Sequence, residues 1–344
     1  MAEKSRTSNN RIMDWLRNTH NIKVEITSFC NAACPGCQRN HMGGKTINEL
    51  DLQHMDLELW KKILVDTQVL DLQEILFDGA VGDMIMHPQA LDFVQAALDA
   101  HPHTEILINT NGGARNAKFW SELGTKLSSR NHRINFAIDG LDDTHSLHRR
   151  NTKYDLIMRN VQAFIGAGGR ASWTFTAFDH NVHQIDLAKS KAIDLGFSYW
   201  EVRGSCIPGT DMEVLTDKEA YQIGTDNIDE IKEELVKIVE EKYPVVNDFG
   251  WIDHKCTAYR ERQIQIDWKG NLWPCSYIYS TEVKTIPERT SPFGEGKLDH
   301  PRENINLKHR SFKDIMEDVF YKEVLPSNIE QECLEVCKER CGLG

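Results

Sequence analysis

The sequence contains no apolar run that approaches the roughly 18 residues a membrane-spanning helix requires. Its N-terminus, MAEKSRTSNNRIMDWL, has no apolar core of the kind found in secretory signal peptides. Lys and Arg number 40 against 52 Asp and Glu, which gives a formal net charge of −12. A chain with a net negative charge is poorly suited to binding nucleic-acid phosphates across a broad surface. We therefore expect a cytoplasmic protein without a membrane partner. The charge disfavours a nucleic-acid substrate such as tRNA, which stays open as a third interpretation because a site can be locally basic.

A cytoplasmic location makes structural disulfides uncommon, so the nine cysteines of the chain point to metal or redox chemistry. Most of them are clustered. The first group is Cys30, Cys34 and Cys37, the second is Cys256 and Cys275, the third is Cys333, Cys337 and Cys341, and Cys206 stands alone.

The segment 22–210 alternates strand-like runs with amphipathic helical stretches. The expected strands are 23–28, 74–77, 105–110, 133–139, 171–178 and 197–203, and the expected helices are 57–67, 89–100, 117–127, 154–167 and 183–196. Strands separated by helix-sized spacers predict an α/β fold with a parallel sheet, either doubly wound or a partial barrel. In both architectures the chemistry belongs at the carboxyl ends of the strands.

The composition changes beyond this α/β segment. Residues 211–243 carry 11 acidic and 4 basic side chains and predict an amphipathic helix within an acidic connector, 211–250. The runs 263–268 and 271–279 flank Lys269-Gly270 and predict a β-hairpin. An extended loop over 281–311 and a helix over 311–325 follow. The predicted organisation is an N-terminal extension (1–21), the α/β domain (22–210), the connector and a small C-terminal domain (251–344).

The first cysteine group lies directly after the first expected strand, in FCNAACPGCQRN. Three closely spaced thiolates can bind three irons of a [4Fe–4S] cluster and leave the fourth iron open for chemistry. A zinc site is the alternative, with His41 available as a fourth ligand.

At these residues the sequence resembles the radical S-adenosylmethionine (SAM) superfamily, whose signature is C-x3-C-x2-C after the first strand. The resemblance implies a (βα)6 partial barrel in which SAM chelates the open iron of the cluster. One electron then cleaves SAM to a 5′-deoxyadenosyl radical, which abstracts hydrogen from a substrate. Gly36 departs from the family pattern, because many members have an aromatic residue before the third cysteine.

Three strand ends extend the resemblance. FDGAVGDMIMHP (77–88) is similar to the glycine-rich turn that binds the SAM amino group, with Met84 in place of the usual proline. Glycines permit close backbone approach, and a carboxylate pairs with an ammonium group. The residues implied in SAM binding at the three strand ends are Gly79, Gly82 and Asp83, then Asn109 and Asn111 for the ribose, then Asp139 with Arg149 or Arg150 for the carboxylate.

The run from Cys256 to Cys275 has the spacing C-x13-G-x4-C and resembles the hairpin of the SPASM and twitch extensions of radical SAM enzymes. The smaller twitch module implies a second, auxiliary [4Fe–4S] cluster, completed by two of Cys333, Cys337 and Cys341. The terminal C-x3-C-G pattern favours Cys337 and Cys341. A zinc ribbon is the rival interpretation.

The resemblance implies oxidation or cross-linking of a peptide, with dehydrogenation of a small polar molecule as the alternative. Cys206, just past the sixth strand, is a candidate hydrogen donor, and Glu201 and Arg203 are candidates for holding the substrate. A flavodoxin or ferredoxin is the implied electron donor. The hypothesis from another class is a zinc-binding scaffold protein.

Overall fold

The computed structural model of the chain describes residues 19–37, 39–40, 43–46, 50–129, 132–204, 212–215, 220–223, 262–275, 279 and 302–318. Within these residues one eight-stranded sheet has the order β10-β9-β1-β2-β3-β4-β5-β6. The first six strands are β1 (Asn21–Val24), β2 (Glu74–Phe77), β3 (Glu105–Thr110), β4 (Arg133–Ala137), β5 (Ala171–Ala177) and β6 (Tyr199–Gly204). They pair in sequence order and in parallel, which confirms the α/β fold predicted from periodicity.

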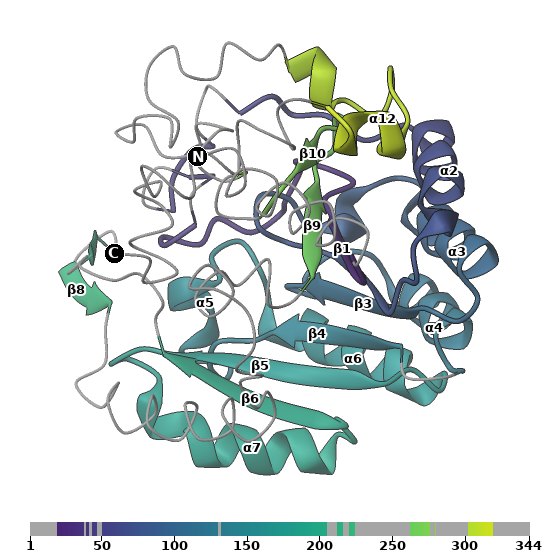
Figure 1. Cartoon of the computed structure of the whole chain (residues 1–344). Coiled ribbons are helices and arrows are strands. Elements are labelled where there is room, and N and C mark those ends of the chain that lie inside the picture. Colours follow the sequence, from purple (N-terminus) through teal and green to yellow (C-terminus); the bar gives the residue numbers. More distant parts are fainter. Residues whose placement is uncertain are drawn as a thin grey trace, which may run out of the picture.

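Helices connect successive strands along one side of this sheet (Figure 1). The long ones are α2 (Leu57–Asp66), α3 (Ala90–Ala100), α4 (Ala117–Lys126), α6 (Tyr154–Gly166) and α7 (Ile185–Asp194), and a short α5 (His145–His148) follows β4. Local signals set their starts: the Asp56 carboxylate caps α2 by accepting from the backbone N–H groups of Glu58 and Leu59. The expected helices therefore all form, with boundaries shifted by a few residues.

Large apolar side chains fill the space between these helices and the sheet. Trp60 of α2 is fully buried, stacks with Phe93, meets Phe77 edge-on, and donates its indole N–H to the Phe93 carbonyl at 3.0 Å. Between α4 and α6, the fully buried rings of Trp120 and Phe164 pack edge to face. This packing fixes the sheet, and with it the strand ends, against the helices.

The predicted hairpin forms as β9 (Gln263–Ile266) and β10 (Leu272–Trp273). Strand β9 also pairs in parallel with β1, so the hairpin extends the main sheet beyond its first strand (Figure 1). The Asp267 carboxylate organises the turn by accepting from the backbone N–H groups of Lys269 and Asn271 and from the Trp273 indole. The sequence predicted the hairpin but not its pairing with β1 of the main sheet.

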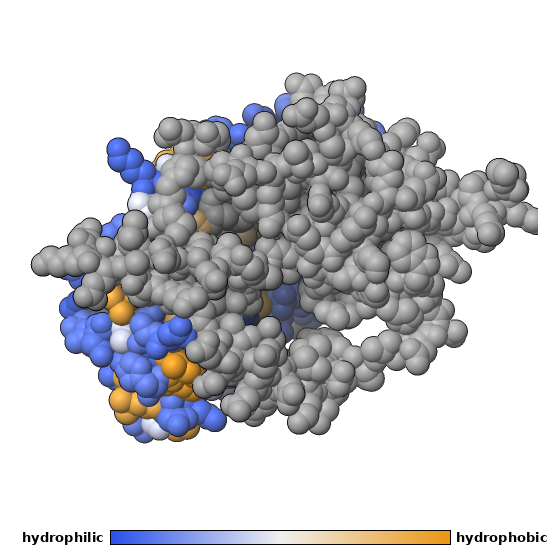
Figure 2. All heavy atoms as spheres, turned by 90° about the vertical axis from the view of Figure 1, so that its left-hand side faces the viewer, coloured by the Kyte–Doolittle hydropathy of each residue, from blue (hydrophilic) through white to orange (hydrophobic). Residues whose placement is uncertain are grey.

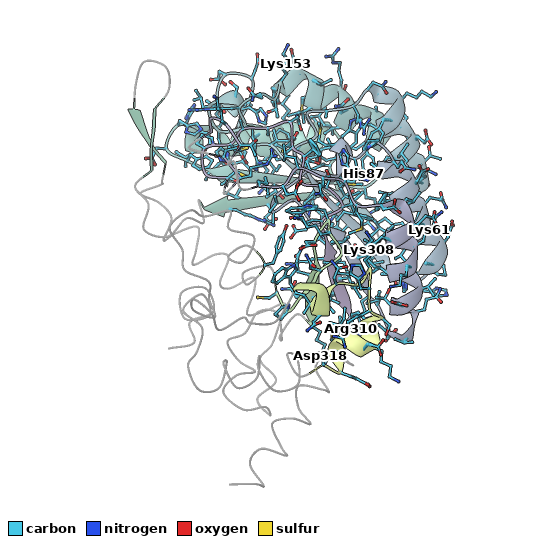
Figure 3. The ribbon with its side chains drawn as sticks, turned by 90° about the horizontal axis from the view of Figure 1, so that it is seen from above. Lys61, His87, Lys153, Lys308, Arg310 and Asp318 are labelled. Carbon is cyan, nitrogen blue, oxygen red and sulfur yellow. The ribbon has the colours of Figure 1, made fainter. Side chains whose placement is uncertain are left out.

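A C-terminal segment packs against the outside of α2. It contains the 3-10 helix η4 (Arg302–Ile305), at the end of the expected 281–311 loop, and α12 (Phe312–Met316), inside the expected 311–325 helix. Lys62 of α2 donates to the Leu307 carbonyl at 2.5 Å, and Arg310 pairs with Asp318 at 2.6 Å (Figure 3). The Lys62–Leu307 contact connects residues more than 240 positions apart in the sequence.

The described part of the acidic connector consists of two strands. Strands β7 (Met212–Leu215) and β8 (Ala220–Ile223) pair antiparallel. The helical stripe predicted from Ile228 onward lies outside the described residues.

No helix in the described part of the chain has the length and apolar character needed to cross a bilayer. Where described residues reach the face seen in Figure 2, hydrophilic side chains are more abundant than hydrophobic ones. Apolar exceptions on the surface include Leu187 and Ile193 of α7, both more than 60% exposed.

Candidate active site

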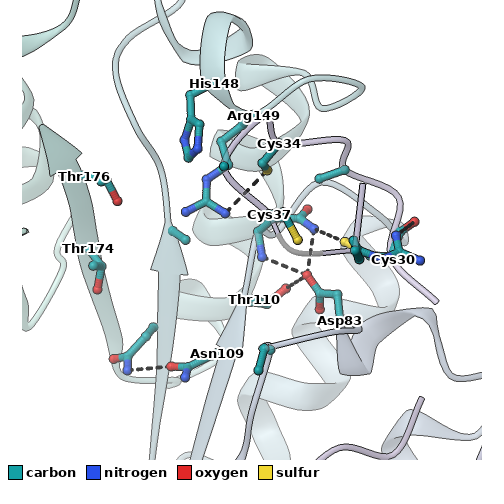
Figure 4. Close-up of a pocket in the computed structure, with 18 of the residues that line it drawn as sticks. Cys30, Cys34, Cys37, Asp83, Asn109, Thr110, His148, Arg149, Thr174 and Thr176 are labelled. Atoms are coloured by element: carbon teal, nitrogen blue, oxygen red, sulfur yellow. Dashed lines mark hydrogen bonds between the residues drawn. The ribbon is translucent and has the colours of Figure 1, made fainter. Parts of the chain in front are cut away.

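A cavity of about 410 Å³ opens at the carboxyl ends of the parallel strands. Its walls come from the cysteine loop after β1, the turn after β2 and the tips of β3 to β6 (Figure 4). This is the position expected for chemistry in a parallel α/β fold, and the volume is in the range of small-molecule sites.

The cysteine loop brings Cys30, Cys34 and Cys37 to one wall of this cavity. The Cys37 backbone N–H donates to the Cys34 carbonyl at 3.0 Å, so the last two cysteines share a tight turn. Arg39 closes the loop from behind, because its guanidinium donates to the carbonyls of Cys30 and Ser28 at 3.1 and 3.0 Å. The loop geometry is therefore fixed by a buried cation next to the thiols.

Burial raises the pKa of all three thiols, to about 12 for Cys30 and about 11 for Cys37. The guanidinium of Arg149, whose Nη1 lies 3.9 Å from the Cys34 sulfur, opposes this effect for Cys34. Thiols with such pKa values remain protonated near neutral pH. They become thiolates on binding metal, which releases the proton.

Asp83 is the central acceptor of the second wall. It is buried, and its Oδ2 accepts from the Thr110 hydroxyl at 3.0 Å and from the backbone and side-chain N–H groups of Asn111 at 2.8 and 2.7 Å. Burial raises the pKa of Asp83, and the hydrogen bonds from Asn111 and Thr110 counteract part of the rise. The Asn111 amide also lies 3.7 Å from the Cys30 sulfur. Asp83 therefore connects the turn after β2 to the cysteine loop through Asn111.

An ion pair with a fully buried carboxylate lies at the tip of β4. The Asp139 carboxylate is fully buried and accepts from the Arg149 Nε, from the His148 ring at 2.7 Å and from the Thr176 backbone N–H at 2.8 Å. Burial alone would raise the pKa of Asp139, but the Arg149 charge and the His148 hydrogen bond hold it below its usual range. Arg149 is thereby aimed at the Cys34 side of the cavity.

The floor of the cavity carries polar side chains from neighbouring strands. Asn109 donates to the Asp78 carboxylate at 3.3 Å and accepts from Asn135 at 2.9 Å, so an amide chain crosses from β2 to β4. At the far edge Arg203 pairs with Glu201 through two hydrogen bonds of 2.8 and 2.9 Å. Any molecule that fills this part of the cavity meets hydrogen-bonding groups rather than an apolar surface.

The structure brings most of the predicted site residues together. Among the described residues of the predicted set, those that line the cavity are Cys30, Cys34, Cys37, Gly79, Gly82, Asp83, Asn109, Asn111, Arg149 and Arg203. Asp139 lies behind Arg149, and Glu201 contacts the cavity through Arg203. Arg150 does not line it, and its carbonyl instead accepts from the Ala33 N–H at 3.0 Å.

Other predicted residues belong to the C-terminal half. Cys275 is half-buried and lies in the segment after β10, outside the cavity. Cys206, Cys256, Cys333, Cys337 and Cys341 lie outside the described residues.

Sequence reasoning missed several lining residues, namely Arg39, Asp78, Asn135, His148 and Thr174. A usable signal exists for one of them. Asn135 is the register partner of Asn109, and alternation along β3 and β4 places both on the same face of the sheet. Thr174 lies in β5, and Arg39, Asp78 and His148 lie in the segments that follow β1, β2 and β4.

The three thiols fit an iron–sulfur cluster better than a single metal ion. No three His, Cys, Asp or Glu side chains of the described residues converge on a point where one ion could sit. In a [4Fe–4S] cluster each thiolate binds a different iron, so such convergence is not required. The buried guanidinium of Arg39 and the partly buried guanidinium of Arg149 supply positive charge beside an anionic group of this kind.

The family comparison agrees with this chemistry. Residues 24–189 match the family model described as the radical SAM superfamily. A curated relative from Pyrococcus furiosus, the tungsten-containing aldehyde ferredoxin oxidoreductase cofactor-modifying protein, is 31% identical over 74 residues. That match spans 22% of this chain and only 19% of the relative's length.

Solved structures share the fold at low sequence identity. Streptococcus suis SuiB bound to S-adenosylmethionine has a TM-score of 0.60 at 14% identity, over 95% of this chain and 71% of SuiB. The enzyme anSMEcpe with bound AdoMet has a TM-score of 0.55 at 12% identity, over 86% of this chain and 80% of that one. The motif at Cys30, Cys34 and Cys37, the family match and the shared fold lead to one conclusion: residues 24–189 form a domain similar to the radical SAM superfamily.

Proposed function

We propose that this enzyme cleaves SAM reductively and uses the resulting 5′-deoxyadenosyl radical to abstract hydrogen from a peptide substrate. The observation that carries the proposal is the convergence of three thiols, a buried carboxylate and a partly buried guanidinium in one cavity at the strand ends. When bound through the three thiolates, a [4Fe–4S] cluster supplies an open iron for SAM and the electron for its cleavage.

The residues of the chain have separable roles in this proposal. Cys30, Cys34 and Cys37 hold the cluster. Arg149, oriented by Asp139, lies on the Cys34 side and pairs with the SAM carboxylate. The turn 78–83 receives the SAM ammonium group, and Asn109 offers hydrogen bonds to the ribose from β3.

For the substrate we propose a peptide, held at the edge where Glu201 and Arg203 meet the cavity. Two neighbours of the same fold support this choice: SuiB was solved with the precursor peptide SuiA, and anSMEcpe with the Cp18Cys peptide. A peptide backbone needs donors and acceptors of the kind that Asn135, Thr174 and Arg203 present. Dehydrogenation of a small polar molecule would use the same groups.

We further propose that Cys275 and Cys256, with two of the three C-terminal cysteines, hold an auxiliary [4Fe–4S] cluster. The support is the pairing of β9 with β1, which fixes the hairpin bearing Cys275 at the edge of the catalytic sheet. An auxiliary cluster at this edge would accept the electron that substrate oxidation releases. A flavodoxin or ferredoxin would reduce the catalytic cluster.

The test compares three proteins reconstituted anaerobically with iron and sulfide: wild type, Cys34→Ala and Cys275→Ala. With SAM and dithionite we expect 5′-deoxyadenosine from wild type and none from Cys34→Ala. Cys275→Ala should retain 5′-deoxyadenosine formation but contain about four fewer iron atoms per chain. Zinc in place of iron in the wild-type protein, with no 5′-deoxyadenosine, would overturn the proposal.

A further inference from the structure

Glu25 is a buried carboxylate that lies behind the active-site cavity without lining it. It follows the last residue of β1 and is 1% exposed. Its Oε1 accepts from the Val81 backbone N–H and its Oε2 from the Gly82 backbone N–H, both at 2.9 Å. Each oxygen of one side chain thus fixes one peptide group of the turn 78–83.

The direction of these N–H groups determines where the carbonyl groups of the turn point. In a trans peptide the N–H and the C=O of one planar unit point in opposite directions. The described residues contain no cis peptide. The N–H groups of Val81 and Gly82 point at Glu25, so the carbonyl oxygens of Ala80 and Val81 point away from it. Ala80 and Val81 both line the cavity.

The turn is also clamped against the start of the cysteine loop. A Cβ added to Gly82 would lie 1.9 Å from the Thr27 carbonyl oxygen, so only glycine fits there. The Asp83 backbone N–H donates to the Phe29 carbonyl at 2.8 Å. With the backbone of residues 27–29 on one side and Glu25 behind, the turn has little freedom to reorient its peptide groups.

We propose that Glu25 is a positioning residue that presents the Ala80 and Val81 carbonyl oxygens to the ammonium group of SAM. The inference rests on the proposed function, because it requires SAM in this cavity. An ammonium group has three donors and no acceptor, so outward carbonyls bind it and outward N–H groups would repel it. Glu25 acts through the turn and does not contact SAM.

Only a carboxylate can accept hydrogen bonds from the N–H groups of both Val81 and Gly82 in this arrangement, since both of its oxygens are acceptors. A glutamine in the same place has one acceptor and one NH₂ group, and the NH₂ group would face a backbone N–H. One of the two peptide groups would then have to rotate away. Glu25→Gln therefore changes the orientation of a backbone carbonyl while nearly conserving volume.

The test measures ligand affinity rather than turnover. Wild type and Glu25→Gln, both reconstituted anaerobically, are titrated with SAM and with 5′-methylthioadenosine, which has the adenosine and sulfur but no amino-acid portion. We expect the SAM dissociation constant to rise about tenfold or more in the variant, the size expected for hydrogen bonds to a charged group. The 5′-methylthioadenosine constant should stay within about twofold of wild type.

Tyr279→Phe is the matched control, because Tyr279 is fully buried close to Glu25 and its hydroxyl has no hydrogen-bond partner among the described residues. It should bind both ligands as wild type does. Equal weakening of the two ligands by Glu25→Gln, or no weakening of SAM, would overturn the inference. If the glutamine variant does not fold, Glu25→Asp replaces it, and the same selective loss for SAM is required. Wild type that binds no SAM would instead refute the proposed function itself.

Discussion

Asp83 and Asn111 bind each other through two hydrogen bonds, from the Asn111 backbone and side-chain N–H groups to the same Asp83 oxygen. The pair joins the turn after β2 to the tip of β3. Because Asn111 also donates to Asn31 at 3.0 Å, the pair extends to the cysteine loop. Asp83 therefore organises the site in addition to offering charge to a ligand.

The Asp83→Asn substitution tests this organising role. An asparagine has one acceptor oxygen where Asp83 has two, so either the Thr110 and Asn111 donors on Oδ2 or the Ile85 N–H on Oδ1 would lose their acceptor. The cost of an unsatisfied buried donor is about 1 to 3 kcal/mol, so we expect a loss of that size in the free energy of unfolding. Anaerobic urea denaturation measures it. Unchanged stability would show that the Asp83 hydrogen bonds contribute nothing net to the fold.

Much of this architecture is predictable from the sequence because its strands and helices have clear periods. The motif residues Cys30 and Asp83 were found at strand ends, where topology brings them together. Glu25 and Arg39 were not found, because their importance comes from burial and from backbone groups that are distant in sequence. The pairing of β9 with β1 was equally hidden, since about 240 residues separate the two strands and no local pattern encodes the contact.

Asp139→Asn should destabilise the protein strongly. It removes the only charge that pairs with Arg149 among the described residues, and breaking a buried pair costs about 3 to 5 kcal/mol. The exposed Asp142 gives a matched control on the same loop, and Asp142→Asn should stay within about 0.5 kcal/mol of wild type. Urea denaturation of all three proteins measures the difference.

The pKa of Asp139 also fixes the pH dependence of that difference. Its folded-state pKa lies below the unfolded value near 3.8, so its stabilisation is complete above about pH 5 and is lost as pH falls through the folded-state pKa. The gap between wild type and Asp139→Asn should therefore be constant from about pH 6 to about pH 8. A gap that changed steadily across this range would mean that another group, such as His148, governs the pair.

Gly82→Ala should disrupt the turn after β2. The new Cβ would lie 1.9 Å from the Thr27 carbonyl oxygen and 2.7 Å from its carbon, and backbone atoms cannot move aside cheaply. We expect a large drop in melting temperature together with loss of SAM binding. Gly166→Ala, at the end of α6, has no atom within 4 Å of the added Cβ and should stabilise the fold by about 0.5 to 1 kcal/mol. A tolerated alanine at position 82 would contradict the close approach of the two backbones.

Arg39→Gln should make the proposed catalytic cluster harder to reduce. Arg39 is 4% exposed, lies two residues past Cys37, and pairs with no carboxylate in the part of the chain that the structure describes. Its charge therefore acts on the cluster site with little screening by water, and it favours the form that carries the extra electron. Removing the charge should lower the reduction potential by tens of millivolts.

Arg39→Lys separates this charge effect from the hydrogen bonds that Arg39 makes to Ser28 and Cys30. Lysine retains the charge but not the two-pronged geometry, so its potential should stay near that of wild type. A redox titration followed by electron paramagnetic resonance measures all three potentials, with iron content determined on the same samples. If glutamine and lysine shift the potential equally at full iron content, Arg39 acts by shaping the loop, and the electrostatic explanation is wrong.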